Sequence, residues 1–193
     1  MKRVVIAHGW EGNPEEGWFP WLRKQLEDNG FEVIIPQLPN PISPRIKTWV
    51  PALAAAVGTP DEQTYLIGHS MGCQAVARYL EGLPVGQTVG GAIFVAGFFK
   101  RLTNLDGDAN SRETEKDWLS SKPDFEKIKT HLRRSIAIFS DDDPFVPSDN
   151  ADDYRDQLGS EIIVKPGMKH FNGESKCFEL PVVFESVLKL AQD

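Results

Sequence analysis

The chain has 193 residues, of which 40% are hydrophobic and 25% charged, a mixture typical of one globular domain. Its formal net charge of -7 argues against nucleic acid as a partner, because binding to phosphates needs clustered Lys and Arg. Two cysteines are too few for a disulfide framework, and no Cys/His cluster has zinc spacing. No apolar stretch has the length of a membrane span or the pattern of a signal peptide, so we expect a cytoplasmic protein without a membrane partner.

Short runs rich in Val and Ile alternate with helical patterns along the chain. Such nearly continuous apolar runs are typical of parallel strands that helices cover on both faces. The predicted strands are residues 3–7, 31–35, 64–67, 91–96, 135–139 and 161–165. The predicted helices are residues 18–29, 44–57, 71–81, 124–132, 148–158 and 178–191. This alternation predicts a single α/β domain over residues 1–193, with a doubly wound, mostly parallel, six-stranded sheet.

Two long connections interrupt this alternation. Residues 36–44 hold four prolines and predict a rigid excursion, and Pro51 is a candidate break inside the second helix. Residues 97–123 are polar, include the run 106–110, and leave room for at most one short helix. Loops of that length are uncommon unless they are functional or mobile, so this segment is either part of a lid or a solvated connector.

The strongest local signal is the pentapeptide 68–72, Gly-His-Ser-Met-Gly, which matches the G-x-S-x-G nucleophile motif. A predicted strand precedes it and a predicted helix follows it. A sharp strand-to-helix turn strains the serine backbone and admits only small neighbours, which explains the glycines. Chance would produce the bare pattern in about one chain in twenty of this length, and the strand–turn–helix context makes chance rarer. The motif predicts Ser70 as a nucleophile at a helix N-terminus, where negative charge is favoured.

A serine nucleophile needs a base that a third group holds in place. In proteins with this turn, the chain order is Ser, then Asp or Glu, then His. Of the four histidines, His8 and His69 precede Ser70, and His131 lies in a polar helix that predicts a surface position. His170 follows the last predicted strand in a turn and is the predicted base. The alternative is an ordinary exposed loop histidine.

The acid is expected after the strand that precedes this one, where Asp141, Asp142 and Asp143 compete. The pattern Asp-x-x-Val-Pro that begins at Asp143 is the one found in this type of fold. Asp143 is therefore the predicted acid, which would orient the imidazole of His170 and stabilise its cation. Asp142 is the alternative, and the remaining aspartates would face water or cap the turn.

An acyl-transfer transition state carries an oxyanion, which needs preorganised hydrogen-bond donors. One expected donor is the N–H of Met71, the residue after the nucleophile. The second is expected in the loop after the first strand, where the N–H of Trp10 is the candidate and that of Glu11 the alternative. His8 in this loop is expected to order it rather than to react.

Aromatic residues near the predicted loops favour an apolar acyl pocket, although packing in the core would explain some of them equally well. The candidate substrate-binding residues are Trp10, Phe98, Phe145 and Phe171. The predicted partner is a small-molecule ester or amide, and no metal or organic cofactor is implied. Two other functions share these residues: a non-catalytic binding protein on the same scaffold, and a thioesterase or acyltransferase.

Together these motifs resemble a family of compact serine hydrolases that includes retinoblastoma-binding protein nine and the YdeN-like proteins. The resemblance covers most of the chain and rests on residues 8–9, 68–72, 125–129, 142–147 and 170–171. It implies a minimal α/β-hydrolase fold with strand order 2-1-3-4-5-6, and a cytosolic hydrolase of small esters or amides. The retinoblastoma-binding motif Leu-x-Cys-x-Glu would fall at residues 175–179, where serine replaces the leucine, so a retinoblastoma-type partner is not expected.

Overall fold

Six parallel strands form one sheet in a computed structural model of the chain, which describes residues 1–105 and 107–192. In chain order the strands are β1 (Arg3–Ala7), β2 (Glu32–Ile34), β3 (Thr64–His69), β4 (Gly91–Val95), β5 (Ser135–Ser140) and β6 (Glu161–Lys165). Their order across the sheet is β2-β1-β3-β4-β5-β6, and every neighbouring pair is parallel. The predicted sheet and its order are confirmed. The direction in which successive strands are added reverses between β1 and β3, and open α/β sheets bind their ligands beyond the carboxyl ends of the strands at such a point.

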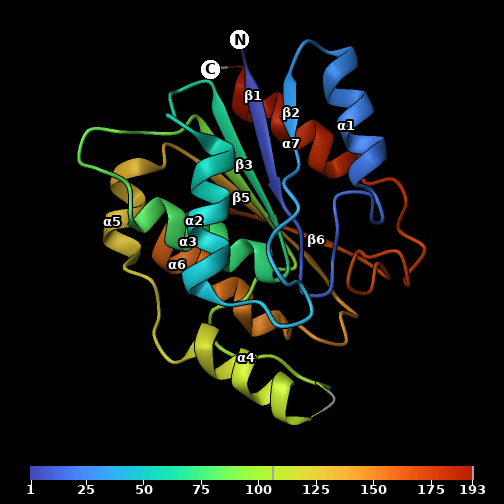
Figure 1. Cartoon of the computed structure of the whole chain (residues 1–193). Coiled ribbons are helices and arrows are strands. Elements are labelled where there is room, and N and C mark those ends of the chain that lie inside the picture. Colours follow the sequence, from blue (N-terminus) through green and yellow to red (C-terminus); the bar gives the residue numbers. More distant parts are fainter. Residues whose placement is uncertain (106, 193) are drawn as a thin grey trace.

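Helices cover both faces of this sheet (Figure 1). Helices α1 and α7 pack on one face, and α2, α3, α5 and α6 pack on the other. Among the described residues, no helix is long and apolar enough to cross a bilayer. The helices are α1 (Phe19–Asp28), α2 (Ile46–Val57), α3 (Met71–Glu81), α4 (Ala109–Leu119), α5 (Phe125–His131), α6 (Ala151–Leu158) and α7 (Pro181–Ala191), with a 3-10 turn, η1 (Ser148–Asn150).

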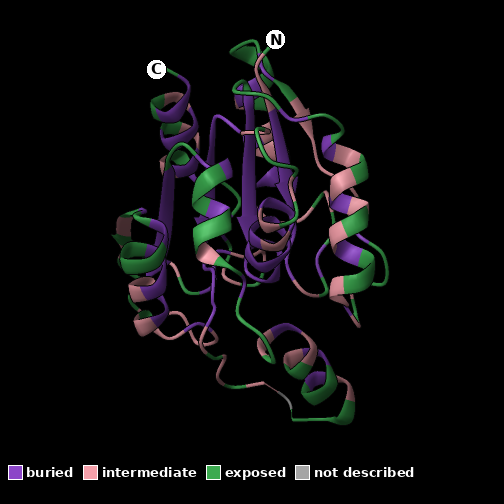
Figure 2. Ribbon diagram, turned by 90° about the vertical axis from the view of Figure 1, so that its left-hand side faces the viewer, coloured by how far each residue is buried: buried purple, intermediate pink, exposed green. Residues whose placement is uncertain are grey.

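Burial on both faces explains why the central strands are nearly continuous in apolar residues, whereas the edge strands β2 and β6 are partly exposed. In β1, Val4 and Ile6 lie in the core under α1 and α7, whereas Val5 and Ala7 lie in the core under α2 and α3. All four side chains are fully buried. Figure 2 shows the central strands buried and the outer faces of the helices exposed.

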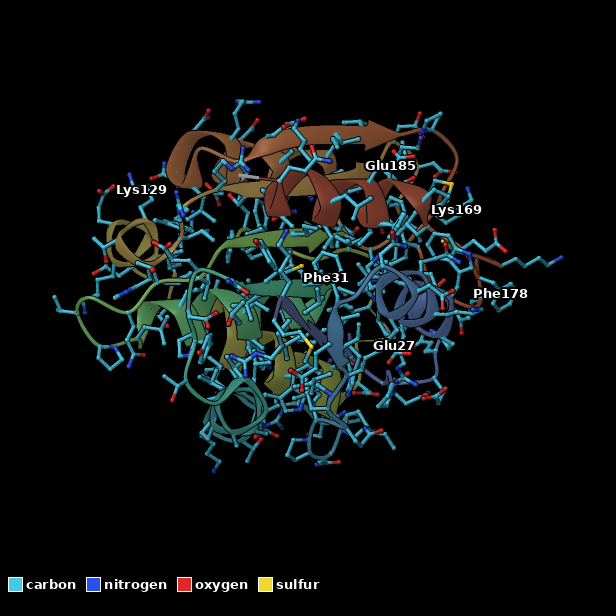
Figure 3. All side chains as sticks on the ribbon, turned by 90° about the horizontal axis from the view of Figure 1, so that it is seen from above. Glu27, Phe31, Lys129, Lys169, Phe178 and Glu185 are labelled. Atoms are coloured by element: carbon cyan, nitrogen blue, oxygen red, sulfur yellow. The ribbon has the colours of Figure 1, made fainter. Side chains whose placement is uncertain are left out.

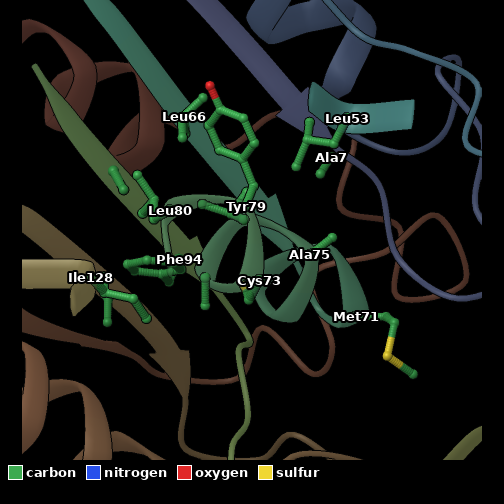
Figure 4. Close-up of a cluster of buried hydrophobic side chains, with 14 of the residues drawn as sticks. Ala7, Leu53, Leu66, Met71, Cys73, Ala75, Tyr79, Leu80, Phe94 and Ile128 are labelled. Carbon is green, nitrogen blue, oxygen red and sulfur yellow. The ribbon is translucent and has the colours of Figure 1, made fainter. Parts of the chain in front are cut away.

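Helix α3 is the most deeply buried helix of the fold. Nine of its eleven residues are buried, because α2 and α5 flank it on the sheet. Figure 4 shows Leu80 of this helix beside Phe94 of the sheet, and Cys73, Ala75 and Leu66 belong to the same buried cluster. The turn that begins this helix is therefore held rigidly against the centre of the molecule.

Helix α4 is the main departure from the predicted elements, since it occupies 11 residues of a segment expected to be mostly loop. Its buried residues, Ser111, Thr114 and Trp118, share one helix face, but only Trp118 is apolar, so hydrophobic periodicity does not reveal the helix. Asp108 caps it by accepting the N–H of Ser111. Figure 1 shows α4 beyond the carboxyl ends of the strands. Asp106, in the predicted polar run, lies outside the described residues.

Two single-residue expectations differ from the structure. Pro51 does not break α2, which continues through it. His131, expected at the surface, is buried at the end of α5, where its Nδ1–H donates to the carbonyl of Gln87 at 2.8 Å. The prediction was wrong because the chain around His131 runs beside Val89, whose N–H donates to the His131 carbonyl.

Candidate active site

Ser70 lies in the sharp turn between β3 and α3, with φ of 53° and ψ of -119°. Such angles are strained for a residue with a side chain. Two backbone hydrogen bonds hold them: the Ser70 N–H donates to the carbonyl of Val95 at 2.9 Å, and its carbonyl accepts the N–H of Cys73 at 3.0 Å. The strained turn therefore has a fixed geometry.

Steric limits explain both glycines of the motif. A Cβ on Gly68 would lie 2.6 Å from the backbone nitrogen of Cys73, and a Cβ on Gly72 would overlap the carbonyl oxygen of Ala7 in β1. Only glycine fits at either position. The missing side chain of Gly72 lets the start of α3 pack directly against the end of β1, and that of Gly68 lets β3 pass close to the backbone of Cys73.

The three predicted catalytic side chains form one hydrogen-bonded chain. His170 Nε2 lies 2.9 Å from Ser70 Oγ, and His170 Nδ1 lies 2.8 Å from Asp143 Oδ2. Asp143 Oδ1 accepts the backbone N–H groups of Phe145 at 2.8 Å and Val146 at 3.0 Å. Because a carboxylate only accepts, His170 carries its proton on Nδ1, which leaves Nε2 to accept the Ser70 hydroxyl proton.

The neighbouring aspartates bond to the turn before His170 rather than to its ring. Asp142 accepts the Lys169 N–H at 2.8 Å and pairs with Lys169 Nζ at 2.7 Å. These bonds to Lys169, with one from the Ser140 hydroxyl, lower the pKa of Asp142 to about 2. Asp141 accepts the N–H of Gly167 at 2.9 Å. The structure thus favours Asp143 over Asp142 as the partner of the imidazole.

The loop after β1 distinguishes the two candidate oxyanion donors. The Glu11 N–H already donates to the carbonyl of Pro41 at 2.8 Å. The Trp10 indole is fixed separately, by its Nε1–H donating to the carbonyl of Ile42 at 3.0 Å. Met71 is the first residue of α3, where backbone N–H groups have no partner within the helix. These contacts favour the N–H groups of Trp10 and Met71 as the donors.

His8 orders this loop, as the sequence leads one to expect. It is fully buried, its Nδ1–H donates to the carbonyl of Gly9 at 2.9 Å, and its Nε2 accepts the N–H of Leu38 at 3.0 Å. Burial lowers the pKa of His8, so the ring stays neutral. Both ring nitrogens are therefore occupied in holding backbone.

A cleft of about 470 Å³ opens above Ser70 and His170. Two of the predicted substrate-binding residues, Trp10 and Phe145, line it. The other two do not, because Phe98 and Phe171 are fully buried in the cores on opposite faces of the sheet. For these two rings, the alternative of core packing is the correct one.

Several residues of the cleft carry no motif and are missed by sequence reasoning. Leu102, Leu105 and Ser111 come from the segment that contains α4 and form one wall. Three carboxylates, those of Glu11, Glu16 and Glu174, also line the cleft, and among its described residues there is no Lys or Arg. Burial raises the pKa of Glu16. No group of three or more His, Cys, Asp or Glu among the described residues could hold a metal ion.

Comparison with known proteins identifies the family. The sequence profile of a family described as serine hydrolase matches residues 4–189. This chain belongs to the serine hydrolase family. YdeN of Bacillus subtilis is 33% identical to it over 184 residues, which are 95% of this chain and 93% of that protein. The serine hydrolase RBBP9 of Rattus norvegicus is 31% identical over 186 residues, 96% of this chain and 94% of that protein.

Solved structures of similar proteins agree with the assignment of this chain to the serine hydrolase family. The crystal structure of the ydeN gene product from B. subtilis matches with a TM-score of 0.91, at 30% identity and over 100% of both chains. Est1E from Butyrivibrio proteoclasticus matches with a TM-score of 0.73 at 15% identity, over 99% of this chain and 88% of that one, a likeness of fold alone. The enzyme therefore has the α/β-hydrolase fold and is similar to the relatives that the motifs resemble.

Proposed function

We propose that this serine hydrolase cleaves small carboxylic esters or amides through an acyl-enzyme on Ser70. His170 acts as general base and acid, Asp143 orients it, and the N–H groups of Met71 and Trp10 bind the oxyanion. The observation that carries the proposal is the hydrogen-bonded chain at the floor of the cleft, with Ser70 Oγ 2.9 Å from His170 Nε2 and Asp143 Oδ2 2.8 Å from Nδ1.

Each step of the proposed reaction uses a group in this chain. Ser70 Oγ attacks the substrate carbonyl carbon while its proton moves to His170 Nε2. The tetrahedral oxyanion accepts the two backbone N–H groups. Collapse breaks the bond to the leaving group, which departs with the proton from Nε2. Water then attacks the acyl-enzyme while His170 Nε2 accepts one of its protons. Collapse breaks the bond to Ser70 Oγ, which takes that proton back from Nε2 as the carboxylic acid leaves.

The lining of the cleft supports the proposed substrate class. Leu102, Leu105, Phe145 and Trp10 provide apolar surface beside Ser70. A volume of about 470 Å³ lies at the small end of the range for small-molecule pockets. An apolar acyl group of modest size can therefore pack beside the nucleophile while its carbonyl faces the oxyanion donors.

Replacement of Ser70 by alanine tests the proposal. We expect Ser70→Ala to lower turnover of p-nitrophenyl acetate by about a million-fold and to abolish labelling by a fluorophosphonate probe. Circular dichroism and the melting temperature serve as controls for folding. Near-normal hydrolysis by the purified variant would rule out the acyl-enzyme.

A panel of matched esters, amides and thioesters tests the substrate class. An enzyme that the probe labels at Ser70, but that prefers thioesters or transfers its acyl group to an added alcohol, would be a thioesterase or acyltransferase instead. A protein that the probe does not label would be a binding protein on this scaffold.

A further inference from the structure

The backbone on both sides of His170 is strained. Lys169 has φ of 51° and Phe171 has φ of 52°, so two residues with side chains adopt the left-handed region. Such conformations persist only where the surrounding structure fixes them. The position of the His170 ring therefore depends on what holds residues 169–171.

Three separate elements hold this short segment through its main chain. Asp142, which follows β5, accepts the N–H of Lys169, the first residue of the segment, at 2.8 Å. His69 Nε2, at the end of β3, lies 2.8 Å from the carbonyl oxygen of its central residue, which is His170. The Nε1–H of Trp18, just before α1, donates to the carbonyl of Phe171, the last residue of the segment, at 2.8 Å. Of these three main-chain bonds, the one from His69 is the one made to His170.

The protonation state of His69 follows from its surroundings. A carbonyl oxygen only accepts, so the ring must carry its proton on Nε2. Burial, followed by the charge on His170, lowers the pKa of His69 to about 3, which keeps the ring neutral. The ring also packs edge-on against Trp18 and Phe19, with centroids 6.1 Å away in each case. His69 is thus a fixed donor, and its engaged Nε2 cannot serve as a base for Ser70.

We propose that His69 is a positioning residue for His170. By donating to the His170 carbonyl, it keeps the imidazole within hydrogen-bond reach of Ser70 Oγ. Because His69 immediately precedes Ser70, one backbone turn sets the place of both the nucleophile and its base. This inference rests on the proposed function and goes beyond it: the His69 ring packs beside the His170 ring, with centroids 5.1 Å apart, but takes no proton in the proposed mechanism.

Two substitutions separate the hydrogen bond from the packing of the ring. His69→Phe keeps a ring of similar size but loses the donor, whereas His69→Gln keeps a donor near the position of Nε2. A displacement of about 1 Å at a reacting group costs about 100-fold, so we expect His69→Phe to lower kcat for p-nitrophenyl acetate by about 10- to 100-fold with little change in KM. His69→Gln should recover most of that loss.

His131→Phe is the matched control. His69 and His131 are both 4% exposed, and each donates from its ring to a main-chain carbonyl at 2.8 Å. Lys129, on the same helix as His131, lies on the opposite side of the molecule from Lys169, the neighbour of His170 (Figure 3). We expect His131→Phe to lower the melting temperature while kcat stays unchanged.

A spectroscopic readout reports on His170 directly. The proton between His170 Nδ1 and Asp143 should give a far-downfield resonance in the wild type and in His131→Phe. We expect this resonance to be broadened or lost in His69→Phe and retained in His69→Gln.

The outcomes separate this inference from the proposed function. Equal kcat in His69→Phe and His131→Phe, or equal loss in His69→Phe and His69→Gln, would overturn the positioning role while Ser70-dependent hydrolysis stands. Absence of Ser70-dependent hydrolysis in the wild type would instead overturn the proposed function. If His69→Phe does not fold, His69→Asn, whose amide is too short to reach the carbonyl, gives the same test.

Discussion

At the scale of single residues, three consecutive aspartates make different hydrogen bonds and so have different roles. Asp143 accepts two backbone N–H groups and faces the imidazole of His170. Asp142 and Asp141 accept N–H groups of the turn that leads to His170. One carboxylate is therefore directed at the base, and the other two hold the chain that carries it.

Asparagine at each position separates these functions. We expect Asp143→Asn to lower kcat/KM for p-nitrophenyl acetate by about ten-thousand-fold, because the amide disfavours the imidazole tautomer that catalysis requires. Asp142→Asn keeps an oxygen that can accept the Lys169 N–H and loses only an exposed ion pair, so it should cost about tenfold or less. The reverse order of effects would mean that Asp142 is the acid.

The sequence predicts the three catalytic candidates better than it predicts the lining of the cleft. Ser70 and His170 follow from a motif and from chain order, because the chemistry requires those residue types in that sequence. An aromatic residue near a loop carries no such information, since a pocket wall and a core select the same side chains. Phe145 lines the cleft and Phe171 is buried, although both stand beside a proposed catalytic residue.

At the scale of elements, the contact of β1 with the start of α3 joins the oxyanion loop to the nucleophile turn. The contact depends on Gly72, whose Cα faces the Ala7 and His8 carbonyls so closely that no side chain fits. It brings the strand end that leads to Trp10 beside the turn that carries Ser70. The two proposed oxyanion donors are therefore held together by one backbone contact.

Alanine at Gly72, in α3, and at Gly82, which caps its C-terminus, tests this contact. Gly72→Ala should destabilise the fold by more than about 3 kcal/mol, because a Cβ would overlap main-chain atoms that cannot move independently. Gly82→Ala at the other end of the helix is the control. There φ is -86° and the nearest atom is at 3.5 Å, so we expect a change within about 1 kcal/mol. Equal stability of the two variants in denaturant would contradict the steric explanation.

Hydrogen bonds attach the segment that contains α4 to the proline-rich loop, residues 36–44, and such bonds leave no periodic pattern in the sequence. Trp118 of α4 donates its indole N–H to the Pro44 carbonyl of the proline-rich loop at 3.1 Å. That loop is itself fixed by Trp49, which donates to the Pro39 carbonyl at 2.7 Å, and by Trp10, which donates to the Ile42 carbonyl at 3.0 Å. Asn110 of α4 also donates to the Ile42 carbonyl, at 2.9 Å. Such contacts between distant segments explain why the helix and its wall of the cleft could not be predicted.

The length of the acyl chain probes this wall. The wall is one short helix and its flanking loop, so we expect p-nitrophenyl esters of short acyl chains to be the best substrates and long-chain triglycerides to be poor ones. The test is kcat/KM across a series of p-nitrophenyl esters. A rate that keeps rising beyond about eight carbons would indicate a longer groove than the cleft above Ser70.

At the scale of the whole molecule, continuous apolar strands made the architecture predictable. Each of the six strands is found, and their order follows the resemblance to the family. A single folding domain over the chain remains a prediction. Charge acts at this scale as well. The formal net charge is -7 and three carboxylates line the cleft, so the charge of the molecule and that of the cleft both repel an anionic substrate.

Anionic esters should therefore be disfavoured. We expect p-nitrophenyl hemisuccinate to react about tenfold more slowly than the neutral p-nitrophenyl butyrate at low salt, with the gap narrowing above about 0.1 M salt as screening sets in. Glu16→Gln should narrow the gap at low salt, since Glu16 lines the cleft. A hemisuccinate rate equal to the butyrate rate at low ionic strength would show that these charges do not reach the reacting carbonyl.

The carbonyl of Ile42 accepts hydrogen bonds from the side chains of both Trp10 and Asn110, so an alanine substitution at position 42 would not reveal its importance. Ile42 is 64% exposed, so truncation of its side chain removes little packing, while the oxygen that joins α4 to the oxyanion loop belongs to the main chain. A deletion within residues 39–44 would disconnect the two segments, whereas truncation of the Ile42 side chain leaves both hydrogen bonds to its carbonyl in place.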